Sequence, residues 1–197
     1  AENIERYGCH ITTGFLGTPY ICNVLTDNGR SDVAYRLLLQ DSCPSWIYPI
    51  TKGATTIWER WDSIRPDGSI IKGMNSFNHY SYGAIGDWLY RSAVGIRETS
   101  VGYKTISIRP HVGGGFGQMR ASTCTPYGIV AAEWHAENDC LRTLAVTIPA
   151  NTTAEIFVPA SSADAVVVSD NSLQPQGFAD GYVLFKVGSG DYRFEVK

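Results

Sequence analysis

The spacing of apolar residues changes character about halfway along the chain. In residues 1–97 apolar positions recur every three or four residues, which is the period of a helix with one buried face. From residue 103 to 197 they fall in short alternating or β-branched runs, which are typical of strands. The pattern therefore predicts a helical part followed by a β part, with the change near residues 95–102.

The helical part is expected to contain three long helices. Polar residues that can cap a helix precede two apolar-periodic stretches, at 12–25 and 31–40, and two helices joined by a short loop form an αα-hairpin. A short segment at 54–61 is followed by a third helix at 75–94. Apolar residues lie on more than one side of that helix, so we expect additional protein to cover it. This part of the chain is therefore expected to belong to a larger helical assembly.

The β part is expected to form an antiparallel sandwich. Turn signals rich in Gly, Pro, Asn and Asp separate its short runs, and strands at regular spacing without helical periods between them are typical of that architecture. Eight strands are predicted, at 104–109, 118–123, 129–135, 141–148, 155–158, 165–169, 182–187 and 192–196.

Composition narrows the possible functions. A net charge of -3 with 18% charged residues does not favour binding to a nucleic-acid backbone. No apolar run reaches the roughly 18 residues of a membrane span, and residues 1–7 are too polar for a signal segment. We therefore expect a soluble protein with no membrane partner, and the sequence does not decide between a cytoplasmic and a secreted location. The five cysteines lack zinc-ligand spacing, so neither a metal nor a cofactor is expected.

The densest cluster of chemistry-bearing residues is TTIWERWD at 55–62. Glu59 lies between Trp58 and Trp61, where apolar walls would raise the pKa of its carboxyl, while the adjacent Arg60 would lower it. Such a carboxylate is a candidate acid or base. The alternative is that Glu59 and Arg60 form a surface pair on a short helix, with the two tryptophans in the core.

A second cluster lies at 74–80, in the sequence MNSFNHY. Asn75, Asn78 and His79 offer donors and acceptors of the kind that a polyhydroxylated ligand needs. The alternative is that Asn75 or Ser76 caps the third helix and that His79 is a hydrogen-bonded core residue.

Three strings in the helical part resemble one family of enzymes. GATTIWERWD at 53–62, MNSFNHYSYGA at 74–84 and GDWLY at 86–90 are similar to the C-terminal region of α-L-rhamnosidases of glycoside hydrolase family 78. TTGFLGTPY at 12–20 is similar to the helices that precede that region, and the similarity continues more weakly after residue 102.

The resemblance implies a fold and a reaction. Residues 1–100 would be the closing helices of an incomplete (α/α)6 catalytic barrel and residues 101–197 a C-terminal β-sandwich domain, which gives an α+β chain in two parts. The family hydrolyses terminal, non-reducing α-L-rhamnose with inversion. Inversion uses an acid and a base about 6.5–9.5 Å apart. The partners implied are a rhamnose-containing glycoside and the missing N-terminal part of the same enzyme.

The resemblance also assigns roles to site residues. Glu59 matches the catalytic base and His79 a histidine that contacts the sugar, while Trp58 or Trp61 would line the wall for the rhamnose methyl group. Asn78 joins them as a substrate-binding residue because of its place in the second cluster. The family's general acid lies upstream of residue 1, so we expect the chain alone to be inactive.

Two other functions remain open at this stage. The chain could be a carbohydrate-binding module without catalytic activity, which would bind sugar without hydrolysis even beside the missing domains. It could also belong to another (α/α)6 glycoside hydrolase, which would cleave a glucoside or uronide in preference to a rhamnoside.

Overall fold

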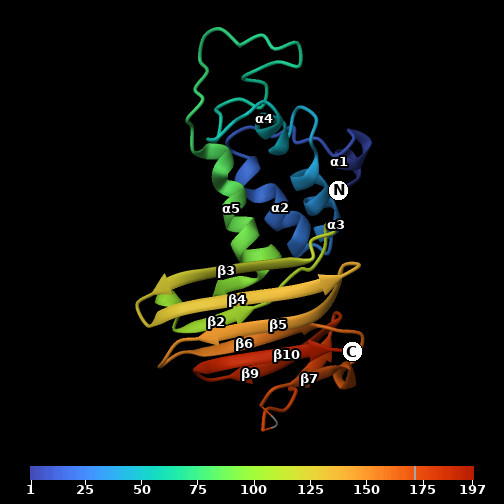
Figure 1. The fold of residues 1–197 in the computed structure, drawn as a ribbon, viewed down its shortest axis with the longest axis vertical. Helices are drawn as coiled ribbons and strands as arrows, with labels where there is room; N and C mark the ends of the chain where they lie inside the picture. The colour runs from blue at the N-terminus through green and yellow to red at the C-terminus, as the bar shows by residue number, and fades with distance from the viewer. Residues whose placement is uncertain (171) are drawn as a thin grey trace. The chain divides into compact units, whose positions relative to one another are not determined.

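Helices precede strands in the computed structural model, which describes residues 1–170 and 172–197 (Figure 1). The chain divides into a helical unit, Ala1–Trp88, and a β unit, Leu89–Lys197. The fold class predicted from the sequence, helical segment first and β-sandwich second, is confirmed. Among the described residues no helix is both long enough and apolar enough to cross a membrane.

The helical unit contains the predicted hairpin. Its helices are α1 (Glu2–Arg6), α2 (Thr18–Asp27), α3 (Ser31–Leu39), α4 (Ile47–Thr51), a 3-10 turn (Ser81–Ala84) and α5 (Ile85–Trp88). The hairpin consists of α2 and α3. The expected start of α2 at residue 12 is wrong, because the Thr13 carbonyl accepts a bond from the Thr18 hydroxyl and Pro19 opens the helix.

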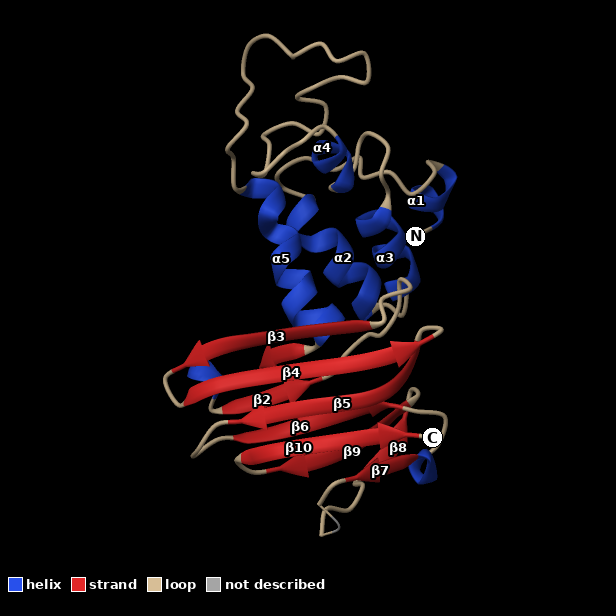
Figure 2. Ribbon diagram, in the orientation of Figure 1, coloured by secondary structure: helices blue, strands red, loops and turns tan. Residues whose placement is uncertain are grey.

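Three helices pack together through aromatic side chains, and Figure 2 shows α2, α3 and α5 side by side. Trp88 of α5 is 1% exposed, and its ring meets the Tyr35 ring of α3 edge to face at 5.0 Å. The indole N–H of Trp88 donates to the Thr26 hydroxyl of α2 at 2.8 Å. The buried indole therefore fills the space between the helices and has its polar atom satisfied.

The predicted helix at 75–94 is wrong at its start. Residues 75–80 are irregular, and helical structure begins only at Ser81–Ala84. The cause is hydrogen bonding to residues 56–59, since the Ser76 carbonyl accepts from the Glu59 N–H, the Phe77 carbonyl accepts from the Thr56 hydroxyl and the His79 N–H donates to the Ile57 carbonyl. Backbone groups used in this way cannot form the first turns of a helix. Residues 54–61 are not helical either.

The β unit opens with a π-helix, Leu89–Val94, and builds two five-stranded sheets. One sheet has the order β1 (Ile96–Glu98), β2 (Thr105–Ile108), β6 (Thr153–Pro159), β9 (Tyr182–Val187), β8 (Gly177–Ala179), and the other has the order β3 (Gln118–Thr125), β4 (Gly128–Glu137), β5 (Cys140–Ile148), β10 (Gly190–Val196), β7 (Val166–Val168). All eight predicted strands are present. The sequence pattern missed β1 and β8.

Strand direction departs from the prediction at one pair. Neighbouring strands run antiparallel, except that β2 and β6 are parallel, with Thr105 opposite Thr153 and Ile108 opposite Ile156. The purely antiparallel sandwich expected from the sequence is wrong at this pair. The chain leaves β2, builds the β3–β4–β5 meander of the second sheet and then returns, so a hairpin between β2 and β6 is impossible.

The core of the β unit lies between the two sheets. Alternate residues of β4 point inward, and Val130, Ala132 and Trp134 are at most 2% exposed. Inward residues of the facing sheet, such as Ile156 and Phe185, belong to the same cluster. This alternation is the period-two pattern that made the strands recognisable in the sequence.

Candidate active site

Two short segments of the helical unit lie side by side and bring the two predicted clusters together. The Glu59 N–H donates to the Ser76 carbonyl at 2.8 Å, and the His79 N–H donates to the Ile57 carbonyl at 2.8 Å. The Thr56 hydroxyl donates to the Phe77 carbonyl between them. Two backbone hydrogen bonds and the Thr56 hydroxyl therefore hold the segment carrying Glu59 against the segment carrying His79.

Trp58 is buried, whereas its neighbours Ile57 and Glu59 are more exposed to solvent. Its side chain is 5% exposed and meets the Phe77 ring edge to face at 5.1 Å. Ile57 is 39% exposed and Glu59 is half-buried.

The surface pair considered as an alternative for Glu59 is wrong. Arg60 bonds instead to Asp62, with Nε 3.2 Å from Oδ1. Among the described residues, none donates a hydrogen bond to the Glu59 carboxylate or forms an ion pair with it. The carboxylate oxygens of Glu59 are therefore available to water or to a ligand.

A row of aromatic rings runs next to these segments, which we call the aromatic row: His79, Phe15, Tyr82, Trp61 and Trp46. The His79 and Phe15 rings stack with centroids 4.9 Å apart and planes 9° apart, and Phe15 contacts Tyr82 at 5.2 Å. Tyr82 stacks on Trp61 at 3.7 Å, and Trp61 meets the edge of Trp46 at 5.5 Å. The row joins His79 to Trp61, two residues that the sequence placed in separate clusters.

Hydrogen bonds fix the tryptophan end of the aromatic row. The Trp61 indole donates to the Thr13 carbonyl at 3.1 Å, and the Trp46 indole donates to the Tyr82 carbonyl at 2.9 Å. Trp61 is half-buried, in contrast to the buried Trp58. Of the two tryptophans, only Trp61 presents substantial surface beside the aromatic row.

The pKa of the Tyr82 phenol depends on burial and on three neighbouring charged residues. Burial raises the pKa of the phenol above the ordinary value, Arg60 opposes that rise, and the negative charges of Asp62 and Glu59 add to it.

The two asparagines of the second cluster have different surroundings. Asn75 accepts a bond from the Ser63 hydroxyl at 2.6 Å and so fastens the loop between them. Asn78 is exposed, and its backbone N–H bonds to the Ser76 hydroxyl at 3.2 Å. Neither Asn75 nor Ser76 caps a helix, so that alternative is wrong, because the helix begins later.

Two of the predicted site residues line an apolar hollow. An apolar hollow of about 210 Å³ in the helical unit is lined by Trp58 and Trp61, together with neighbours such as Ile57 and Tyr82. Glu59, His79 and Asn78 do not line it. It is therefore an apolar space beside the candidate site and not the site itself.

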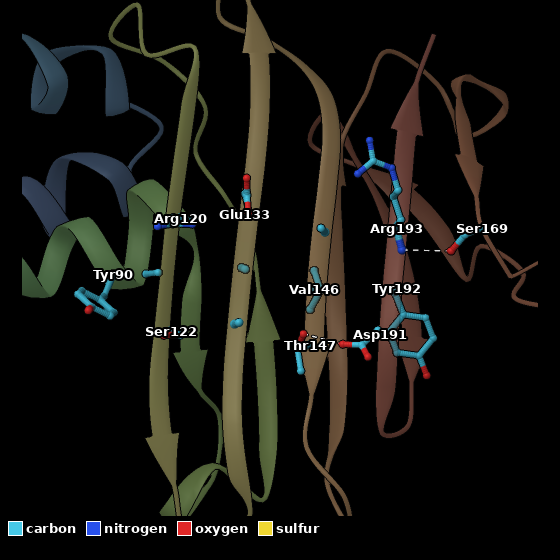
Figure 3. A pocket seen from close by; sticks show the side chains of 14 residues that line it. Tyr90, Arg120, Ser122, Glu133, Val146, Thr147, Ser169, Asp191, Tyr192 and Arg193 are labelled. Atoms are coloured by element: carbon cyan, nitrogen blue, oxygen red, sulfur yellow. Dashed lines mark hydrogen bonds between the residues drawn. The ribbon is translucent and has the colours of Figure 1, made fainter.

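A second hollow, of about 710 Å³, lies in the β unit on the outer face of the sheet that contains β3, β4, β5 and β10 (Figure 3). Ala131 and Ala145 form part of its floor. Much of its polar surface is already paired, since the Thr147 hydroxyl donates to Asp191 at 2.6 Å and Arg193 pairs with Glu195 at 3.4 Å. None of the predicted site residues lies there, and we interpret it as a solvated sheet face.

Sequence reasoning missed Phe15 as an individual site residue. It lies within the string TTGFLGTPY, in which the sequence pattern predicts the start of a helix at residue 12. A large aromatic residue between Gly14 and Gly17, in a segment that is not helical, was a signal that could have been used.

Among the described residues no group of three or more His, Cys, Asp or Glu side chains could hold a metal ion.

Helical hairpins followed by a two-sheet domain, with an unpaired carboxylate beside aromatic rings, define the C-terminal part of a helical-barrel glycoside hydrolase. Residues 1–93 match the model of the bacterial α-L-rhamnosidase six-hairpin glycosidase domain, and residues 95–172 match the bacterial α-L-rhamnosidase C-terminal domain. The chain belongs to the bacterial α-L-rhamnosidase family.

Named relatives agree with this assignment. An α-L-rhamnosidase of Streptomyces avermitilis is 46% identical over 194 residues, covering 98% of this chain and 18% of that protein. One from Formosa agariphila is 44% identical over 172 residues, covering 87% of this chain and 18% of that protein. The chain therefore spans about a fifth of the length of the relatives it matches.

Solved structures show the same relationship. The Streptomyces avermitilis α-L-rhamnosidase complexed with L-rhamnose matches with a TM-score of 0.94 at 46% identity, over 100% of this chain and 19% of that one. The native enzyme from Aspergillus terreus matches with a TM-score of 0.86 at 32% identity, over 100% of this chain and 21% of that one. The resemblance seen in the sequence is confirmed.

Proposed function

We propose that this chain supplies the closing helices of the catalytic barrel and the C-terminal β domain of an inverting α-L-rhamnosidase, which removes terminal α-L-rhamnose from glycosides. The observation that carries the proposal is the backbone pairing that holds Glu59 beside the His79 segment, with no described partner for the carboxylate. Family membership and the rhamnose complex of the Streptomyces avermitilis relative support the choice of sugar.

In this proposal Glu59 is the general base. Its ionised carboxylate accepts a proton from a water molecule, whose oxygen attacks the anomeric carbon of rhamnose. The bond from that carbon to the glycosidic oxygen breaks as a general acid protonates the leaving oxygen. That acid comes from protein outside these 197 residues, so the chain alone should not hydrolyse a rhamnoside.

The remaining candidate residues would bind the sugar. His79 and the exposed Asn78 carry groups that hydrogen-bond hydroxyls. Trp61, half-buried at the edge of the aromatic row, would form the apolar wall for the C6 methyl group. Trp58 would support that wall from the core side, because it is buried.

The experiment uses a complete enzyme that contains this chain. The homologous segment of the Streptomyces avermitilis α-L-rhamnosidase is replaced by residues 1–197, and release of p-nitrophenol from p-nitrophenyl α-L-rhamnoside is measured. Glu59→Gln should lower kcat about 1,000-fold and leave KM within a few fold, because the amide keeps the shape but cannot accept the proton. NMR of the first product formed should show the β-anomer of rhamnose.

The matched control is Asp62→Asn, which changes a neighbouring carboxylate that already pairs with Arg60. It should keep kcat within about tenfold of the unmodified enzyme. An unchanged kcat in Glu59→Gln would exclude Glu59 as the general base. Rhamnose binding without hydrolysis by the unmodified chimera would favour the carbohydrate-binding alternative.

A further inference from the structure

Two aromatic rings lie parallel to the His79 ring. Phe15 stacks on one face, with centroids 4.9 Å apart and planes 9° apart, and Tyr80 is parallel to the ring at 5.6 Å and 6°. Both ring nitrogens lie at the edge of the imidazole, so a hydrogen bond to a ligand runs in the plane that this stack sets. The orientation of that edge therefore decides which His79 atom a sugar can reach.

One ring nitrogen is already engaged. The Ser81 N–H donates to His79 Nδ1 at 3.4 Å, and a backbone N–H can only donate. Nδ1 is then the acceptor of a neutral imidazole, which places the ring hydrogen on Nε2. The outward edge of His79 consequently presents an N–H donor, which suits a hydroxyl oxygen of a sugar.

The two stacking partners do not contribute equally. Tyr80 is 88% exposed, whereas Phe15 is 43% exposed and is held from behind by Tyr82 at 5.2 Å. Tyr82 is itself buried and stacked on Trp61. Phe15 is therefore held in place by its neighbours, whereas the solvent-exposed Tyr80 side chain is free to change rotamer.

We propose that Phe15 is a positioning residue for sugar binding, because its ring fixes the plane of His79 so that Nε2–H points to a hydroxyl of the bound rhamnose. The inference rests on the proposed function of His79. Phe15 would act through His79 and not by touching the sugar, so its effect on binding should depend on the presence of the imidazole.

The test is a double-mutant cycle in the Streptomyces avermitilis chimera, with p-nitrophenyl α-L-rhamnoside as the substrate. Phe15→Leu should raise KM about tenfold with a smaller change in kcat. The His79 ring would then be free to rotate, and ordering it on binding would weaken its hydrogen bond to the sugar. Phe15→Tyr keeps a flat ring and should restore KM. In the His79→Ala background, Phe15→Leu should have almost no further effect.

The control is Phe178→Leu, the same change at a phenylalanine of β8 that is 46% exposed. It should leave KM unchanged. If the KM of the double variant equals the product of the two single-variant effects, Phe15 acts independently of His79. That result would show a general structural role for Phe15 and overturn the inference. If His79→Ala itself leaves KM unchanged, the proposed sugar contact fails, whereas a raised KM for His79→Ala with an unchanged one for Phe15→Leu sinks only the role of Phe15.

A second measurement needs no activity. Nitrogen-15 NMR of the imidazole in the 197-residue chain should show the Nε2–H tautomer of His79, and Phe15→Leu should convert it to a mixture of tautomers. A single unchanged tautomer in Phe15→Leu would contradict the positioning role, even where the chimera folds poorly.

Discussion

The Trp88 indole donates to the Thr26 hydroxyl at 2.8 Å across 62 residues of sequence. Both side chains are buried, at 1% and 3% exposure, so water cannot replace either partner. The bond joins α5 to α2 at the point where the large indole also meets Tyr35. A single hydroxyl therefore decides whether the largest side chain among these helices has its polar atom satisfied.

Thr26→Val should destabilise the helical unit by about 1–3 kcal/mol, because it keeps the shape and leaves the indole N–H unpaired. Urea unfolding followed by tryptophan fluorescence measures the change. Thr26→Ser retains the hydroxyl and should recover most of the loss. Equal stability of the Val variant and the unmodified chain would show that the bond contributes nothing.

The loop between Ser63 and Asn75 should open when its fastening bond is removed. Asn75→Ala removes the 2.6 Å bond from the buried Ser63 hydroxyl, which keeps its 3.1 Å bond to the Arg60 carbonyl on its own side of the loop, so we expect faster tryptic cleavage at the exposed Lys72. Asn78→Ala is the control, since the Asn78 side chain bonds to no described residue. Mass spectrometry of the peptides gives both rates, and identical rates at Lys72 would contradict the expectation.

Thiol reactivity should separate the cysteines by burial. Burial raises the pKa of the Cys22 thiol to about 12, against an ordinary value near 8.5, so at pH 8.5 about one Cys22 in several thousand is a thiolate. Iodoacetamide should label the exposed Cys124 and Cys140 first and label Cys22 only after unfolding. The neutral thiol also favours the fold, and this contribution is complete below about pH 8.5 and is lost as pH rises toward 12. Rapid labelling of Cys22 at pH 8.5 in the folded chain would disprove its protection.

Gly95 should tolerate no side chain. Its φ is +94°, and an added Cβ would lie 2.3 Å from the carbonyl carbon of Arg109 and from the nitrogen of Pro110. Gly95→Ala should cost more than about 3 kcal/mol, because the backbone itself must move. Gly181 has a φ of +77° and nothing within 4 Å of an added Cβ, so Gly181→Ala should cost only about 1 kcal/mol. Urea unfolding followed by far-ultraviolet circular dichroism compares the two, and equal costs would exclude the steric explanation.

Much of the fold was visible in the sequence because burial leaves a periodic trace. The alternation along β4 marked a strand with one buried face. The three-residue strands β1 and β8 left no such trace, since they are too short for alternation and depend on pairing with neighbours.

The candidate site was visible only in pieces. Glu59 and His79 stood out because their side chains are unusual among aromatic neighbours. Their proximity depends on the carbonyls of Ile57 and Ser76, and backbone groups have no sequence signature. The stack of Phe15 on His79 joins residues 64 positions apart, which no local pattern can predict.

The parallel pairing of β2 with β6 has a consequence for the order of folding. Thr105 finds its partner Thr153 only 48 residues later, whereas β3, β4 and β5 pair with their sequence neighbours. Closing the longer loop costs more chain entropy, so the meander forms early and the β2–β6 contact comes late. Until then Ile106 and Ile108 are exposed to solvent. The pairing of β5 with β10 is equally long-range, so the aggregation risk of the β unit is greatest while the meander has formed and these two pairs are still open.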